Sequence, residues 1–284
     1  MQVQSPPLRA QFDPLSFSLR ALVWLAALLV ASVFVWLVGY IVIKGFPYLS
    51  LRLFEWEYSS ENVSMLPAIV VTVLMVVLAL LFAAPVGMGA AIYLVEYARR
   101  GNRLVSLVRL TTESLAGIPS IVYGLFGFLL FVVACGMGFS ILGGALTLAV
   151  MVLPIIMRTT EEALKSVPDN WREGSFALGA GRLRTIFCVV LPAAVPGILS
   201  GVILSIGRIV GESAALLYTA GTVAAMPESL FSSGRTLSVH MYALLSEGLY
   251  VNEAYATALV LLIVVLLINF ASSAVAALLV RERS

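Results

Sequence analysis

The sequence contains few of the side chains on which enzymatic and metal sites depend. Of its 284 residues, two are cysteine and one is histidine, and these three show no metal-ligand spacing. His240 has no partner set for a buried catalytic cluster, which argues against a membrane-embedded enzyme. The glycine-rich phosphate loop that ends in Gly-Lys-Ser/Thr is also missing, so any ATP hydrolysis linked to this chain must come from a partner.

Charged side chains are equally scarce. They make up 11% of the sequence, against roughly a quarter in soluble domains. Hydrophobic residues make up 61%, the mean hydropathy is +1.05, and the apolar residues form long runs. Because a large soluble core would not be arranged in such runs, the composition predicts an all-α polytopic membrane protein.

Six apolar segments are each long enough to cross about 30 Å of hydrocarbon as a helix. We expect a cytoplasmic amino-terminal tail at 1–20, a first transmembrane helix with an outer loop at 21–65, and a transmembrane domain at 66–284. The second span is long enough to tilt or to break near Pro85. The predicted spans are 21–42, 66–94, 115–134, 139–157, 192–218 and 256–280.

Basic residues indicate which side of the membrane each loop faces. The predicted topology puts 13 lysines and arginines on one side, 3 on the other and Arg208 within the membrane, which accounts for all 17. The richer side carries both termini and the polar loop 158–192, so we expect these to be cytoplasmic. Cys135 and Cys188 then face opposite sides, and we expect both thiols to be free.

The loop 158–192 is the longest polar segment between apolar spans. A proline and an acid at 168–169 predict a helix start, and Gly179 predicts its end. A second short amphipathic run at 183–190 leads into the next span. We therefore expect a helix–turn–helix at the membrane surface, which is either a docking element or an amphipathic loop that lies on the lipid headgroups.

The order of residues favours the docking element. The loop resembles the Glu-Ala-Ala loop of ABC-importer permeases at six positions, namely Glu173, Gly174, Ser175, Gly179, Leu191 and Pro192. Gly174 and Ser175 replace the two alanines, and both are small enough to preserve close helix packing. In that family the loop forms coupling helices that fit into a groove on the cytoplasmic ATPase, so the resemblance implies the same role for these six residues.

The fifth predicted span carries two charged residues, Arg208 and Glu212. They are four positions apart, which puts them on one face of a continuous helix. Arg208 follows Pro192 by 16 residues, or roughly 24 Å of helix, so it is predicted to lie beyond the midplane toward the outer side. A charge facing lipid costs on the order of a few kcal/mol even there, so both side chains must face protein or water.

Two interpretations of this pair stay open. It is either a structural ion pair that fixes helix packing, or a cation of a translocation pathway with Glu212 as its resting partner. The second is favoured because the planar fork of arginine makes two parallel hydrogen bonds to a tetrahedral oxyanion. An acid beside it would also accept a hydrogen bond from a protonated oxyanion.

Glycines and prolines are frequent within the spans. Most are expected to allow close helix–helix packing. At 196–197 and 207–211 we expect hinges or a broken helix instead. Glu96 is expected to be an interfacial acid near Arg99.

Three further segments resemble phosphate ABC-importer permeases, namely 85–98 in the second span, 115–126 in the third and 207–217 in the fifth. Together with the loop they cover roughly 66–280. The short amino-terminal region resembles the second of the two phosphate permeases of that family. Ser213 and Ala215 stand where threonine and proline are expected, so the backbone after Glu212 is expected to differ locally.

The resemblance implies a type I ABC importer permease fold with six transmembrane helices, acting on inorganic phosphate in the cytoplasmic (inner) membrane. The implied partners are a homologous second permease, two ATP-binding subunits, a periplasmic or surface phosphate-binding protein and the lipid bilayer, and no nucleic acid is expected. No cofactor is expected in this chain, because ATP and Mg would be bound by the partner ATPase.

Two other functions stay open. The chain could be a permease for another oxyanion, such as molybdate or sulfate, or a non-transporting structural or signalling subunit. The outer loop 221–252 is expected to contain a short helix. That helix either meets the binding protein or packs as a cap on the bundle.

Overall fold

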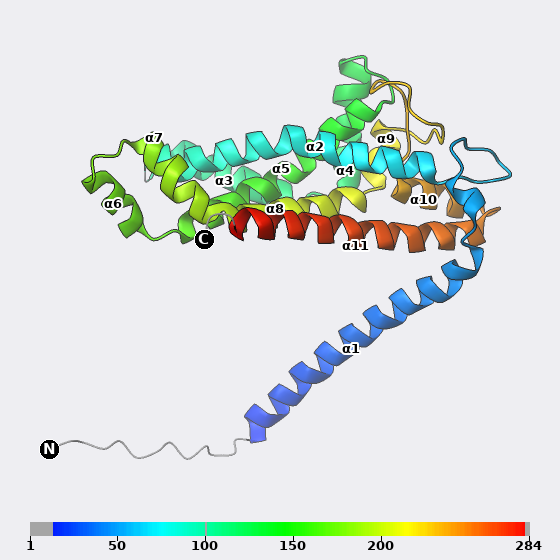
Figure 1. The fold of residues 1–284 in the computed structure, drawn as a ribbon, viewed down its shortest axis with the longest axis horizontal. Coiled ribbons are helices and arrows are strands. Elements are labelled where there is room, and N and C mark those ends of the chain that lie inside the picture. Colours follow the sequence, from blue (N-terminus) through cyan, green and yellow to red (C-terminus); the bar gives the residue numbers. More distant parts are fainter. Residues whose placement is uncertain (1–13, 100, 282–284) are drawn as a thin grey trace.

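All regular secondary structure in the described residues, 14–99 and 101–281, is helical in a computed structural model (Figure 1). The long helices are α1 (Pro14–Gly45), α2 (Leu66–Ile92), α5 (Ile141–Ser166), α8 (Leu191–Val210) and α11 (Val251–Arg281). The shorter helices are α3 (Arg103–Ala116), α4 (Ser120–Gly127), α6 (Asp169–Ala177), α7 (Arg182–Thr185), α9 (Ala214–Thr219) and α10 (Leu237–Glu247). The predicted all-α class is confirmed. The predicted tail falls mostly outside the described residues, and α1 already includes its last seven positions, 14–20.

Five helices of the described chain are long and apolar enough to cross a membrane, and there are six spans if one bent pair is counted as a single span. The bent pair is α3 with α4 and its continuation to Ala134, which meet at 106°. The third span was expected as one helix over 115–134, so this prediction was wrong at its start. Pro119 explains the bend, because it lacks a backbone N–H and disfavours helical geometry in the residue before it.

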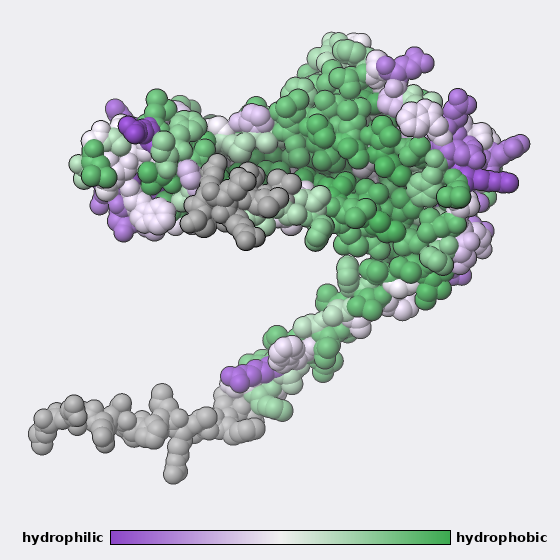
Figure 2. Space-filling view, in the orientation of Figure 1, coloured by the Kyte–Doolittle hydropathy of each residue, from purple (hydrophilic) through white to green (hydrophobic). Residues whose placement is uncertain are grey.

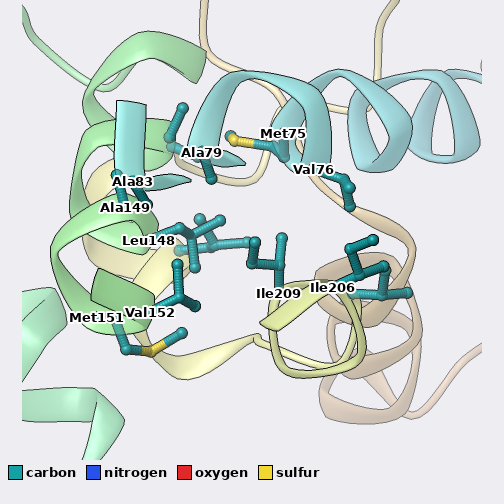
Figure 3. Packing of buried hydrophobic residues seen from close by; sticks show 14 of the residues in the cluster. Met75, Val76, Ala79, Ala83, Leu148, Ala149, Met151, Val152, Ile206 and Ile209 are labelled. Atoms are coloured by element: carbon teal, nitrogen blue, oxygen red, sulfur yellow. The ribbon is translucent and has the colours of Figure 1, made fainter. Parts of the chain in front are cut away.

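The core is formed where α2, α5 and α8 pack together (Figure 3). Met75 and Ala79 of α2 lie opposite Ile206 and Ile209 of α8, with α5 completing the cluster. All of these side chains are buried. Burial of such side chains in a membrane protein reflects close packing rather than removal from water, because lipid is equally apolar.

Glycines let α8 approach α5 closely. A Cβ atom on Gly197 would lie 2.6 Å from the Cβ of Ala163, and a Cβ on Gly201 would overlap the side chain of Thr159. Since α8 continues without interruption past Pro196, the hinge expected at 196–197 is not formed. These positions serve helix packing instead.

Two other predicted boundaries differ from the structure. The second span is unbroken at Pro85 and continues to Ile92, where a π-helical turn extends it to Tyr97. The fourth span continues to Ser166, so the first nine residues of the loop predicted at 158–192 belong to α5. The helix–turn–helix itself is present as α6 and α7, and α7 passes through a π-helical turn directly into α8.

Hydrophilic residues gather at the two ends of an apolar bundle (Figure 2). One end carries α6 and α7, and α11 finishes on the same end (Figure 1). The other carries α10 and the loop between α1 and α2. There the carboxyl-terminal end of α1 meets α11, with the hydroxyl groups of Tyr40 and Tyr255 3.3 Å apart. The amino-terminal part of α1 points away from the bundle (Figure 1). This distribution is that of a chain that spans a membrane.

The helix expected in the outer loop is α10, and it packs against the bundle. Leu237, Val239, His240 and Leu244 are all buried. Burial, and to a smaller extent the charge of Arg235, lowers the pKa of His240 from 6.5 to about 3, while the nearby Val63 backbone opposes the shift. His240 is therefore neutral at physiological pH.

Candidate functional site

Arg208 lies in the last turn of α8, which ends at Val210. A cation is favourable at this position, because the carboxyl end of a helix carries partial negative charge. The side chain is exposed in the isolated chain. The break expected near 207–211 is confirmed, since Gly211 caps α8 and the next helix begins only at Ala214.

Arg208 opens onto a groove of about 610 Å³ between α5, α8 and α11. Its other lining residues are Ile155, Ile203, Leu204, Gly207 and Asn269. The walls are thus largely apolar, with one guanidinium and one amide as polar groups. Such a combination could bind an anion, because arginine offers five N–H donors and asparagine two more.

Asn269 was not identified from the sequence. Its signal is a single amide within the apolar run of α11. Uncharged amides are common enough in membrane helices that this signal alone does not distinguish a pathway residue from a helix-packing residue. Only the packing of α11 against α8 brings Asn269 to the groove that Arg208 lines.

Glu212 occupies a different environment from the one expected. It lies beyond the end of α8 and is buried. Its carboxylate accepts a hydrogen bond from the Ala215 backbone N–H at 3.1 Å, and its carbonyl accepts one from the Ser238 hydroxyl at 2.6 Å. Within the described chain Arg208 forms no ion pair with it, because the helix break at Gly211 ends the regular spacing of α8.

The segment that resembles a coupling loop forms the end of the molecule farthest from α10 (Figure 1). Three apolar side chains of this segment, Trp171, Phe176 and Leu178, are exposed, and Leu178 is 91% exposed. Glu173 and Gly174 are exposed as well. An apolar group of this kind at a polar end of the molecule is typical of a protein–protein contact.

The remaining residues of the coupling pattern shape the segment. The Ser175 hydroxyl lies 2.8 Å from the hydroxyl of buried Thr185 and so ties α6 to α7. Gly179 adopts a positive φ of 83°, which a glycine accommodates without strain at a helix end. Leu191 and Pro192 begin α8, where the missing N–H of proline is tolerated.

The chain is similar in sequence to known transport proteins. The family model for binding-protein-dependent transport system inner membrane components matches residues 83–284. The probable ABC transporter permease protein YqgI of Bacillus subtilis is 35% identical over 266 residues, which cover 87% of this chain and 90% of that protein. The phosphate transport system permease protein PstA of Mycobacterium leprae is 35% identical over 250 residues, covering 84% and 81%.

A solved structure shares the fold. One chain of a bacterial alginate ABC transporter, crystallised with its alginate-bound periplasmic protein, superimposes with a TM-score of 0.65 at 17% identity and covers 92% of this chain and 96% of its own length. The chain therefore belongs to the family of binding-protein-dependent transport system inner membrane components, the membrane-spanning permease subunits of ABC importers.

Proposed function

We propose that this chain is a permease subunit of an ATP-driven importer that moves inorganic phosphate across the cytoplasmic membrane. The observation that supports it most strongly is the similarity, over most of the chain, to proteins named as phosphate transport permeases. The exposed guanidinium of Arg208 in a largely apolar groove supports an anionic substrate. A tetrahedral oxyanion could accept two parallel hydrogen bonds from its planar fork.

In our proposal Glu212, which lies beyond the end of α8, also belongs to the substrate site. Its bond to Ala215 fixes the start of α9, and so the shape of the break beside Arg208. A carboxylate there would accept a hydrogen bond from a protonated phosphate, which sulfate at neutral pH cannot donate. Unchanged preference for phosphate over sulfate in a Glu212→Gln variant would remove this role.

The partners follow from the family. We propose a homologous second permease, two cytoplasmic ATP-binding subunits and a phosphate-binding protein on the outer side. The exposed group Trp171, Phe176 and Leu178 supports contact with an ATPase, and the alginate transporter was solved together with its periplasmic protein. ATP and Mg would be bound by the ATPase, and coupling would use Glu173, Gly174, Ser175, Gly179, Leu191 and Pro192.

We further propose that both termini are cytoplasmic and that the chain is a multi-pass protein of the inner membrane. The excess of basic residues on the side of the 158–192 loop supports this orientation. So does the direction of α11, which ends toward the end of the bundle that carries α6 and α7 (Figure 1). The coupling loop would then face the compartment that holds ATP.

Uptake of radiolabelled phosphate into cells tests the proposal, with wild type compared with Arg208→Lys and Arg208→Ala. Loss of a charge-assisted hydrogen bond costs about 1.5–3 kcal/mol, so we expect Arg208→Ala to lower uptake roughly 10- to 100-fold and Arg208→Lys to lower it less. Co-purification of the ATPase should be unchanged. Normal uptake in both variants would leave Arg208 as a structural residue, and uptake of sulfate or molybdate in place of phosphate would favour another oxyanion.

A further inference from the structure

The side of α6 that faces the bundle carries Arg172. The guanidinium of Arg172 donates two hydrogen bonds to one oxygen of Glu96, at 2.8 Å from Nη2 and 3.2 Å from Nε. Glu96 belongs to the π-helical turn that extends α2. The pair thus joins two segments that are 76 positions apart in the sequence.

Arg172 also holds the end of α5. It donates to the carbonyl oxygens of Leu164 at 2.8 Å and Val167 at 2.7 Å. A second carboxylate, that of Asp169, lies 3.3 Å away. The Arg172 and Glu96 side chains are only 13% and 8% exposed, whereas Asp169 is 74% exposed. The Glu96 contact is therefore shielded from water and geometrically defined, while the Asp169 contact resembles an ordinary surface ion pair.

Polar contacts are what attach α6 to the bundle. No residue of α6 is buried, and the apolar cluster at this end of the molecule, which includes Leu94, Leu164 and Val190, contains none of its side chains. Apart from its backbone connections, α6 is held by the hydrogen bonds of Arg172 and by the contact between the Ser175 and Thr185 hydroxyl groups. Among the described hydrogen bonds and ion pairs, only the Arg172–Glu96 contact joins α6 to the end of α2.

From Glu96 the second span leads back into the core. Met75, Ala79 and Ala83 of α2 lie in the cluster that contains Ile206 and Ile209 (Figure 3). These two isoleucines flank Arg208 in the sequence of α8. Because the cluster is closely packed, a displacement of the Glu96 end that is carried along α2 would change the packing of α2 against the last turns of α8.

We propose that Arg172 is a positioning residue that transmits movement of α6 to α2 through Glu96, so that closure of the ATPases and rearrangement of the Arg208 groove occur together. The inference rests on the proposed coupling role of the 158–192 loop, and it does not require the substrate to be phosphate. Glu96 then transmits movement within the chain through its ion pair with Arg172. The exposed side of α6 remains available to bind the ATPase.

The test uses the complete transporter with its co-purifying partners, reconstituted into proteoliposomes. ATP hydrolysis and phosphate uptake are measured in the same vesicles, and their ratio is compared between wild type, Glu96→Gln and Arg172→Gln. We expect the uptake per ATP hydrolysed to fall at least roughly fivefold in both variants, while the assembled complex still hydrolyses ATP. Asp169→Asn is the matched control, since it removes the exposed carboxylate that contacts the same arginine. This variant should retain the wild-type ratio.

Two further variants separate transmission from stability. Arg172→Lys keeps the charge but loses the planar fork, so we expect an intermediate ratio in a fully assembled complex. The exchange of charges in Glu96→Arg with Arg172→Glu should restore part of the ratio lost in the single variants. A wild-type ratio in both single variants, a proportional fall of hydrolysis and uptake, or loss of assembly in all variants would each overturn the proposal.

The substrate assignment is tested separately in the same vesicles. If wild-type vesicles take up another oxyanion instead of phosphate, the assignment to phosphate fails. The uptake per ATP hydrolysed is then measured with that anion in the same variants. That result alone tests the role of Arg172.

Discussion

The helical core and the short helix α6 are held in place by different interactions. In the core, α2, α5 and α8 pack through apolar and small side chains, and a Cβ added at Gly201 would overlap Thr159. At α6, a Cβ added at Gly174 would meet nothing within 4 Å, and hydrogen bonds and ion pairs connect the helix to the bundle.

This difference indicates how the two regions can behave. A closely packed core tolerates little change of volume, so a displacement of one of its helices is transmitted to the neighbouring helices. A helix attached through a few polar contacts can move relative to its neighbours while keeping those contacts, and it exposes its apolar side chains to a partner. The same substitution should therefore have opposite effects in the two regions.

Alanine in place of glycine gives the largest expected effect. Gly201→Ala should lower the stability of the purified protein by about 1–3 kcal/mol, because the new methyl group forces α8 away from Thr159 of α5. Gly174→Ala should raise it by up to about 1 kcal/mol, since alanine favours the helix. Thermal unfolding in detergent measures both. Equal effects would mean that α6 is packed as closely as the core.

A charge on the exposed side of α6 should affect assembly and leave the fold intact. Leu178→Asp places a carboxylate where the wild-type side chain is 91% exposed, so the thermal unfolding temperature should change little. Association with the ATPase should weaken at least roughly tenfold, measured by co-purification at graded subunit concentrations. Gly207→Ala, remote from α6, serves as the control for assembly. Full association of the Leu178→Asp protein would show that this side chain is not in the interface.

Acid should destabilise the end of the molecule that carries α10. The pKa of His240 is about 3 in the folded chain and 6.5 in the unfolded chain, so the unfolded state binds the additional proton between these values. Stability should therefore fall as the pH drops below about 6.5, by about 1.4 kcal/mol at pH 5.5. Unfolding of wild type and His240→Gln at pH 7.5 and 5.5 checks this, and an unchanged pH dependence in the variant would exclude His240 as its source.

The smallest expected effect concerns the link between α6 and α7. Ser175→Ala removes the hydroxyl that contacts buried Thr185, at a cost of about 1 kcal/mol. The loss should appear as faster amide hydrogen exchange in 169–185, with little change in the core. Ser200→Ala, which removes a hydroxyl bonded within α8 itself, should leave exchange in 169–185 unchanged. Equal protection of α6 in the Ser175→Ala protein would mean that Arg172 alone holds this helix.

Local patterns were sufficient to predict much of the fold. The apolar runs predicted the long helices because the length of a helical span follows from bilayer thickness. The helix–turn–helix at 169–185 followed from a proline, an acid and a glycine, each of which acts on the backbone within one turn. The same reasoning could have predicted the bend at Pro119. The apolar composition of 115–134 instead led to the prediction of one continuous helix there.

The candidate site was predicted less completely. Arg208 stood out because a charge inside an apolar span is costly. Its expected pairing with Glu212 assumed that α8 continues, whereas the helix ends at Val210 and Glu212 instead binds the Ala215 N–H. Asn269 lacked such a signal, since one amide in an apolar helix has several explanations.

The sequence by itself determined that the chain is a helical membrane protein, which regions are apolar enough to cross the bilayer, and which loop carries the coupling pattern. Hydropathy, helix-end residues and charge distribution act locally, so they can be read without the fold. Only the tertiary structure decided that Glu96, expected as an interfacial acid near Arg99, pairs with Arg172, and that Asn269 shares a groove with Arg208. These contacts depend on how distant helices pack, because an ion pair or a groove exists only between surfaces that the whole bundle brings together.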